Sequence, residues 1–319
     1  MTLDQLNTFL LASGELNFSR TARLLHLSQS AVSQQIRELE EDLGVTLFER
    51  RNRAISLTPG GERLRLLAST IVRDVKRARA ELESLKGVPQ GVLRIGATMT
   101  PGVYLLPHAL GRYSQRFPGI RTGLRITHAE ELLSLLNAGE LDLAVVEEDP
   151  AANRTHGWER TPLMQDELVL IVPPEHPWSA REAIAPDELS SQPFIFRQQD
   201  SKTRQLILDR LSEAGVAPES LVTRFELSNT EGIKHAVMAG LGVGFVSCFA
   251  MAIERRARLL VDVPIAGVSI TRTLWLLKPP PARAFAHQER FCELLGRADW
   301  LPASFTLAQS EPAVSAHDA

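Results

Sequence analysis

Cysteine is scarce in this chain, and long apolar runs are missing altogether. The 319 residues include two cysteines, Cys248 and Cys292, which are too few for a disulfide scaffold. We expect both to be buried small hydrophobic residues; a redox-sensing pair is the sharper alternative. No segment approaches the roughly 20 apolar residues of a membrane helix, and the N-terminus has no basic-then-apolar signal pattern. We therefore expect a cytoplasmic protein with no membrane partner.

Signatures of catalysis are also missing. The sequence has no GxSxG elbow, no metal-spaced His/Cys cluster and no Walker loop. Its most glycine-rich stretch, AGLGVG at 239–244, follows a predicted helix and enters a strand. A dinucleotide fingerprint needs the opposite order, a strand and then a helix. We expect no enzyme, no cofactor and no metal site.

Charge is unevenly distributed. The net charge is −3, but nine basic residues oppose two acidic ones between positions 50 and 79. Local cation density, not the charge of the whole chain, sets attraction to nucleic-acid phosphates. The length also implies more than one domain.

Residues 18–44 are predicted to form two short helices joined by a tight turn, with Ser28 capping the second helix. Apolar residues line one stripe of that helix: Val32, Ile36, Leu39 and Leu43. Hydroxyl, amide and guanidinium groups occupy the opposite arc: Ser30, Ser33, Gln34 and Arg37. Such a face suits a DNA major groove, where Gln pairs with adenine and Arg with guanine. A helical hairpin with an ordinary polar surface is the alternative.

A small two-stranded wing is predicted next, from residues 47–50 and 54–57 around the turn Arg51-Asn52-Arg53. Arginines at its tip would contact phosphates or enter the minor groove; a solvated surface turn is the alternative.

A long helix follows, with apolar residues at heptad spacing: Leu64, Ala68, Ile71, Val75, Ala78, Leu82 and Leu85. This seam implies a partner helix. We prefer a dimer to packing on the chain's own C-terminal domain.

Beyond Gly91 predicted strands and helices alternate in two sets, which indicates parallel sheets covered by helices. The last strand and helix are expected to return to the first set. The result is two α/β lobes joined by two crossing segments, with a cleft between them.

Taken together, these parts resemble a LysR-type transcriptional regulator. The resemblance rests on LNTFL, FSRTARLLHLSQSAVSQQIRELEEDLGVTLFER and LTPGG in order, and on GELDLAVVEE and SNTEGIKHAVMAGLGVGFVS further on. It implies an α+β multidomain chain with an N-terminal winged helix-turn-helix, a dimerising linker helix and a two-lobed periplasmic-binding-protein-like effector domain. It also implies tetramers that bend double-stranded DNA and respond to a small inducer. The run ATMTPGVYLLP is similar to members that govern carbon-fixation and sulfur-assimilation genes.

The resemblance divides the chain into domains and assigns site residues. The domains are 1–60 for DNA binding, 61–88 for the linker helix, 91–165 with 267–302 and then 166–266 for the effector subdomains, and 303–319 for a loose tail. The implied DNA-binding residues are Ser19, Gln29, Ser30, Ser33, Gln34, Arg37, Arg51 and Arg53. The implied inducer residues are Thr98, Met99, Thr100, Thr127, His128, Phe196, Arg197, Ser201, Lys202, Thr203, Arg204 and Asn229.

Elementary electrostatics favours an anionic inducer. Residues 98–100 and 201–203 each precede a predicted helix, so free amides and the positive end of the helix dipole point at a bound ligand. Arg197 and Arg204 add positive charge, whereas Lys202 either adds to it or points away. Ordinary helix capping by the Ser and Thr residues is the alternative. A redox-responsive regulator that uses Cys248 and Cys292 is the alternative function.

Overall fold

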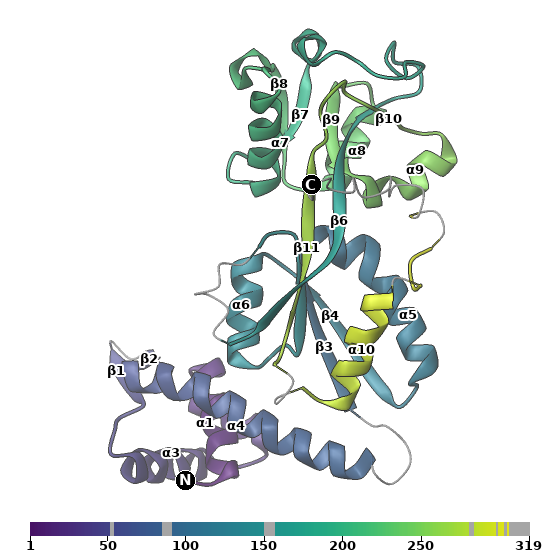
Figure 1. Ribbon diagram of the computed structural model, residues 1–319. Coiled ribbons are helices and arrows are strands. Elements are labelled where there is room, and N and C mark those ends of the chain that lie inside the picture. Colours follow the sequence, from purple (N-terminus) through teal and green to yellow (C-terminus); the bar gives the residue numbers. More distant parts are fainter. Residues whose placement is uncertain are drawn as a thin grey trace, which may run out of the picture.

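The computed structural model describes residues 1–51, 54–84, 91–149, 157–280, 284–297, 299–302 and 305. In Figure 1 a small helical unit leads through the long helix α4 (Pro59–Ser84) to two α/β lobes. Two strands, β6 (Glu159–Val172) and β11 (Thr271–Lys278), run from one lobe into the other. Within these ranges every helix is too short or too polar to span a membrane.

Three capped helices form the N-terminal unit: α1 (Leu3–Glu15), α2 (Phe18–Leu25) and α3 (Gln29–Leu43). Thr2, Asn17 and Ser28 each accept a hydrogen bond from a free amide in the first turn of the helix that follows. Gly44 ends α3 at φ +69°, a conformation that strains other residues. The predicted helix pair and its Ser28 cap are confirmed.

The predicted wing is an antiparallel pair, β1 (Phe48–Arg51) and β2 (Ala54–Leu57). The turn residues 52 and 53 lie outside the described part of the chain. Gly61, at the start of α4, packs directly on the wing: a Cβ there would lie 2.2 Å from the carbonyl oxygen of Leu47. The absent side chain therefore lets the wing and α4 approach closely.

The packing of helix α4 shows that part of the predicted dimer seam is wrong. Leu64 and Ala68 pack into the core of the N-terminal unit, together with Val72, which the seam did not include. The first turns of the helix thus face α1 of their own chain, which explains their apolar spacing without a second chain. Farther along, the Ser69 hydroxyl donates to the carbonyl of Ala138 at the end of α6 (Ala129–Ala138), so α4 also contacts the first lobe.

One nine-stranded sheet runs through both lobes, in the order β4-β3-β5-β11-β6-β9-β7-β8, with β10 beside β6. The remaining strands are β3 (Gly91–Ala97), β4 (Ile120–Ile126), β5 (Leu143–Val146), β7 (Phe194–Arg197), β8 (Thr223–Leu227), β9 (Val243–Ser247) and β10 (Val261–Val263). β3 pairs in parallel with β4 and β5, and β7 with β8 and β9, as predicted. The crossing strands are antiparallel to their neighbours.

Helices cover the sheet in each lobe (Figure 1). In the first lobe they are α5 (Leu106–Arg116), α6 and α10 (Ala286–Arg297), and in the second α7 (Lys202–Glu213), α8 (Thr230–Met238) and α9 (Ala252–Ala257). The helix predicted from 101 to 117 begins instead with a π-helical turn, Pro101–Leu105. Pro107, which has no amide hydrogen, sits in the first turn of α5, where no donor is needed. Of the predicted loose tail, Phe305 is described, and it is buried in the core of the first lobe.

Candidate functional site

The solvent-facing side of α3 carries a continuous polar network. Gln34 donates from Nε2 to Glu38 at 2.9 Å and accepts from Arg37 Nη2 at 3.2 Å, while Arg37 Nε donates to the carbonyl of Ser33 at 3.3 Å. Gln29, Ser30, Gln34 and Arg37 are exposed, and Ser33 is half-buried. Ser19 is exposed in the first turn of α2. The structure therefore brings the predicted reading residues of α3 together on one face.

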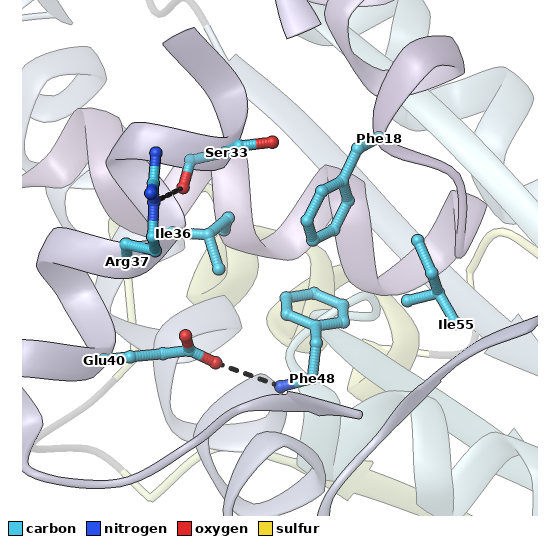
Figure 2. A pocket seen from close by; sticks show the side chains of 7 residues that line it. All are labelled: Phe18, Ser33, Ile36, Arg37, Glu40, Phe48 and Ile55. Atoms are coloured by element: carbon cyan, nitrogen blue, oxygen red, sulfur yellow. Dashed lines mark hydrogen bonds between the residues drawn. The ribbon is translucent and has the colours of Figure 1, made fainter. Parts of the chain in front are cut away.

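The wing is held against α3 by one carboxylate. Glu40 Oε1 accepts from the backbone amides of Leu47, at 2.6 Å, and Phe48, at 3.2 Å. Phe18 packs edge-on against Phe48, with ring centroids 5.2 Å apart. Figure 2 shows the pocket that results between α3 and the wing, with Arg37 on one side and the two rings on the other. Its volume is about 360 Å³.

The predicted wing arginines are less completely described. Arg51 ends β1, and its backbone pairs with Ala54 of β2. Arg53 lies outside the described residues. Contacts from either guanidinium group to DNA therefore stay predictions.

The two lobes meet at a largely buried group that we call the inter-lobe cluster: Thr100, Glu147, Asp166, Thr203 and Arg272. Arg272 of β11 lies opposite Asp166 of β6 in the ladder, and its Nε donates to that carboxylate at 2.8 Å. Its Nη1 donates to Thr203 Oγ1 and its Nη2 to Thr100 Oγ1, both at 3.0 Å. One guanidinium group thus binds both lobes.

Glu147 completes the cluster from the end of β5. Its Oε1 accepts from the amide of Thr100 at 2.8 Å and from Arg272 Nη2 at 3.3 Å. Burial lowers the pKa of Arg272, but Glu147 and Asp166 outweigh that effect and hold the pKa above its ordinary value. The guanidinium group is therefore charged at every physiological pH.

The second lobe adds a cation beside this cluster. Arg197 ends β7, close enough to Glu147 and Arg272 for their charges to act on its pKa. Burial is the largest influence and lowers that pKa. Its Nε is buried without a hydrogen-bond partner among the described residues. A buried guanidinium donor without an acceptor costs free energy until an acceptor arrives.

The other predicted inducer residues of the first lobe differ in whether they contact the inter-lobe cluster. Thr98 is buried, and its hydroxyl accepts from the amide of Glu147. Met99 is 38% exposed. Thr127 donates to Glu131 within the first turn of α6, and His128 is exposed at the cap of that helix. Thr98 thus joins the cluster through Glu147, whereas Thr127 is engaged in its own helix.

The predicted inducer residues of the second lobe also differ: some lie near the inter-lobe cluster, and others are bonded elsewhere. Thr203 contacts Arg272, and Lys202 lies near enough to Glu148 of the first lobe to lower the pKa of that carboxyl, against the larger raising effect of burial. Arg204, in contrast, donates to Glu226 at 2.5 Å and to the carbonyl of Arg197.

The three remaining residues have structural roles. Phe196 is buried in the core of the second lobe. Ser201 caps α7, and Asn229 caps α8 by accepting from the amide of Gly232. The capping given as the alternative is therefore present at Ser201, and Asn229 caps its helix in the same way.

Sequence reasoning missed Glu147, Asp166 and Arg272. Glu147 directly follows the apolar strand β5, just as Thr98 directly follows β3. Both residues therefore lie at the same edge of the sheet, and this shared position could have indicated Glu147. Asp166 lies between Gln165 and Glu167 in the middle of β6, and Arg272 lies in the polar start of β11. Their pairing spans 106 residues, so spacing along the chain gave no sign of it.

Both cysteines are free thiols, and burial raises the pKa of each. Burial raises the pKa of Cys248 to about 12, and nearby Asp166 adds to the effect. Burial raises the pKa of Cys292 to about 11. A thiol that stays protonated is a poor nucleophile.

In the described part of the chain, no group of three or more His, Cys, Asp or Glu residues could hold a metal ion.

Comparison with known proteins agrees with this geometry. Residues 3–62 match the model of the bacterial regulatory helix-turn-helix protein, lysR family, and residues 86–300 match the LysR substrate binding domain. A probable RuBisCO transcriptional regulator of Trichormus variabilis is 33% identical over 322 residues, covering 100% of this chain and 96% of that protein.

Two solved structures are also similar. A full-length single-residue variant of OxyR from Pseudomonas aeruginosa has a TM-score of 0.71 and 26% identity, covering 95% of this chain and 96% of that one. The regulatory domain of CcmR from Synechocystis PCC6803, in complex with 2-PG, has a TM-score of 0.58 and 26% identity, covering 66% of this chain and 97% of that one. The helix-turn-helix unit, the two-lobed domain and these relatives together establish that the chain belongs to the family of LysR-type transcriptional regulators.

Proposed function

We propose that this regulator reads DNA sequence through α3 and that a small anion bound at the inter-lobe cluster changes how it sits on DNA. The observation that carries the ligand proposal is the buried Nε of Arg197, which has no acceptor among the described residues and lies beside Arg272. A carboxylate, a phosphorylated metabolite or an inorganic oxyanion would supply that acceptor. The CcmR regulatory domain, solved with 2-PG, supports a small ligand in this domain type.

DNA reading rests on the exposed face of α3. Gln34 and Arg37 present amide and guanidinium groups that match base edges in the major groove, with Gln29, Ser30 and Ser33 on the same face. In the free protein Gln34 hydrogen-bonds Glu38 and Arg37. These three side chains must exchange partners when Gln34 binds a base. Ser19 and the arginines of the wing would contact the sugar-phosphate backbone and set the register.

Ligand binding would act through Glu147. This carboxylate already occupies the acceptor position beside Arg272 and the amide of Thr100, as a ligand anion would. An incoming anion that replaces it would bond to Arg272 and Arg197 together. Because Arg272 also binds Thr203, the exchange would alter the contacts that fix one lobe relative to the other. The crossing strands β6 and β11 are the segments that such a movement would bend.

We further propose a homodimer through α4 and a homotetramer built from such dimers. Leu67, Ile71 and Leu82 are 52%, 39% and 65% exposed, on a face of α4 that their own chain leaves uncovered. Their spacing of four and eleven residues keeps them on one face of the helix, where Ile71 and Leu82 belong to the predicted heptad seam and Leu67 lies beside it. An apolar stripe of this kind is covered by a partner helix in water. Such an assembly acts in the cytoplasm, without an enzymatic step of its own.

Isothermal titration calorimetry of the full-length protein with 2-PG, phosphate and sulfate measures the affinity of each anion and so tests the ligand site. We expect one of these anions to bind, and we expect Arg197→Gln to weaken that binding at least about tenfold, because a charge-assisted hydrogen bond contributes about 1.5–3 kcal/mol. Arg224→Gln is the matched control, since Arg224 is exposed on the far edge strand β8. Equal affinities in wild type and Arg197→Gln would remove Arg197 from the site.

A further inference from the structure

A second basic pocket lies in the first lobe, outside the inter-lobe cluster. It opens between α5 and α10, which lie side by side in Figure 1, and its volume is about 390 Å³. Four arginines line it: Arg112, Arg116, Arg290 and Arg297. The size falls within the range of small-molecule sites.

The described carboxylates of this pocket offset its positive charge only in part. The lining contains two carboxylates, Glu293 and Asp299. No described carboxylate lies within 4.0 Å of a nitrogen of the four arginines, since none of them takes part in an ion pair. Like charges one helical turn apart, as in Arg112 and Arg116, destabilise a helix. A concave surface of one sign concentrates counter-ions.

Two of the guanidinium groups are held in place by an aromatic ring. Arg116 and Arg290 lie 5.6 Å and 5.3 Å from the ring centroid of Phe117. Tyr113, beside them, is anchored because its hydroxyl donates to the carbonyl of His287. Phe117 thus joins an arginine of α5 to one of α10 before any ligand arrives. Such preorganisation lowers the entropy that binding costs.

We propose that this pocket binds a small polyanion carrying at least two phosphate or carboxylate groups, as a second site separate from the inter-lobe cluster. Arginine forks match both kinds of group with paired hydrogen bonds. Two anionic groups match the excess of four arginines over two carboxylates. A ligand here would bridge α5, which follows the turn after Thr100, and α10, which follows the strand of Arg272. It would therefore join the two segments that lead to the inter-lobe cluster.

Isothermal titration of the full-length protein with inorganic pyrophosphate and with citrate tests this site. At about 0.15 M ionic strength exposed charges are well screened beyond about 8 Å. We expect at least one probe to bind below millimolar concentration. The double variant Arg112→Gln with Arg290→Gln should weaken binding about a hundredfold through the loss of two charge-assisted hydrogen bonds. Because both side chains are exposed, the variant should keep the thermal unfolding midpoint of the wild type.

Two controls separate the outcomes. Arg121→Gln with Arg224→Gln removes the same charge from exposed positions elsewhere, and it should leave the affinity within about twofold. Arg197→Gln, at the inter-lobe cluster, should also leave it unchanged, so this result is independent of the proposed function. Binding of neither probe, an equal loss in the control pair, or a loss in Arg197→Gln alone would overturn the proposal. So would a double variant that loses affinity for DNA and retains affinity for both probes.

Discussion

The replacement Glu147→Gln tests the idea that this side chain holds the place of the ligand. Glutamine keeps the shape of the side chain and one acceptor oxygen but removes the negative charge. The Arg272 and Arg197 cations then lose a neighbouring anion and should attract an external one more strongly. We therefore expect the variant to bind 2-PG, or whichever anion binds the wild type, more tightly and not more weakly.

The size of the effect follows from two hydrogen bonds. An incoming anion must replace Glu147 at the amide of Thr100 and at Arg272, 2.8 Å and 3.3 Å from its Oε1. Hydrogen bonds to charged groups contribute about 1.5–3 kcal/mol and neutral ones about 0.5–1.5 kcal/mol, so each replacement becomes easier by about 1 kcal/mol. The sum of about 2 kcal/mol corresponds to an affinity gain of about 30-fold.

Isothermal titration of wild type, Glu147→Gln and Glu148→Gln measures this gain. Glu148 is the matched control, because it is the next residue, loses the same charge and is more exposed than Glu147, while the described carboxylates that form ion pairs with Arg272 are Glu147 and Asp166. We expect it to change the affinity by less than about threefold. An unchanged or weaker affinity in Glu147→Gln, or equal gains in both variants, would refute the displacement argument.

The remaining predictions concern DNA reading, assembly and the cysteines. Gln34→Ala or Arg37→Ala should relax the preference at one base position by ~1–3 kcal/mol, and an unchanged preference in a binding-site selection would show that the reading face is elsewhere. Ile71→Lys with Leu82→Lys should give monomers by light scattering, because the charges replace the exposed apolar stripe of α4; dimers that persist would exclude this stripe as the seam. Cys248 and Cys292, whose pKa values of about 12 and about 11 keep them protonated at pH 8, should resist a thiol reagent in the folded protein. Rapid labelling under native conditions would revive the redox alternative.

Local patterns predicted the DNA-binding unit well. The apolar period of α3, the Ser28 cap and the paired wing depend on residues close together in the chain, so their physics is visible in the sequence. The long helix shows where this reasoning stops. Heptad spacing says which positions are apolar but not what covers them, and Leu64 and Ala68 are covered by the chain's own N-terminal unit.

The inter-lobe cluster was predicted only in part. Thr98, Thr100, Arg197 and Thr203 lie at or beside it, each near the end of a strand or the start of a helix. Arg272, their common partner, depends on the register between β6 and β11, which no short-range pattern carries. Arg204 was expected to face the ligand as well. It reaches back to Glu226 on β8, because α7 turns that side chain toward the edge strand.

The affinity of the purified protein for its own promoter, compared with a random duplex of equal length, tests the central claim most directly. Both should be measured by fluorescence anisotropy at about 0.15 M salt, because phosphate contacts alone weaken steeply with salt. A protein that reads bases through α3 should prefer the promoter by about a thousandfold or more. Equal affinities for the two duplexes would contradict the account.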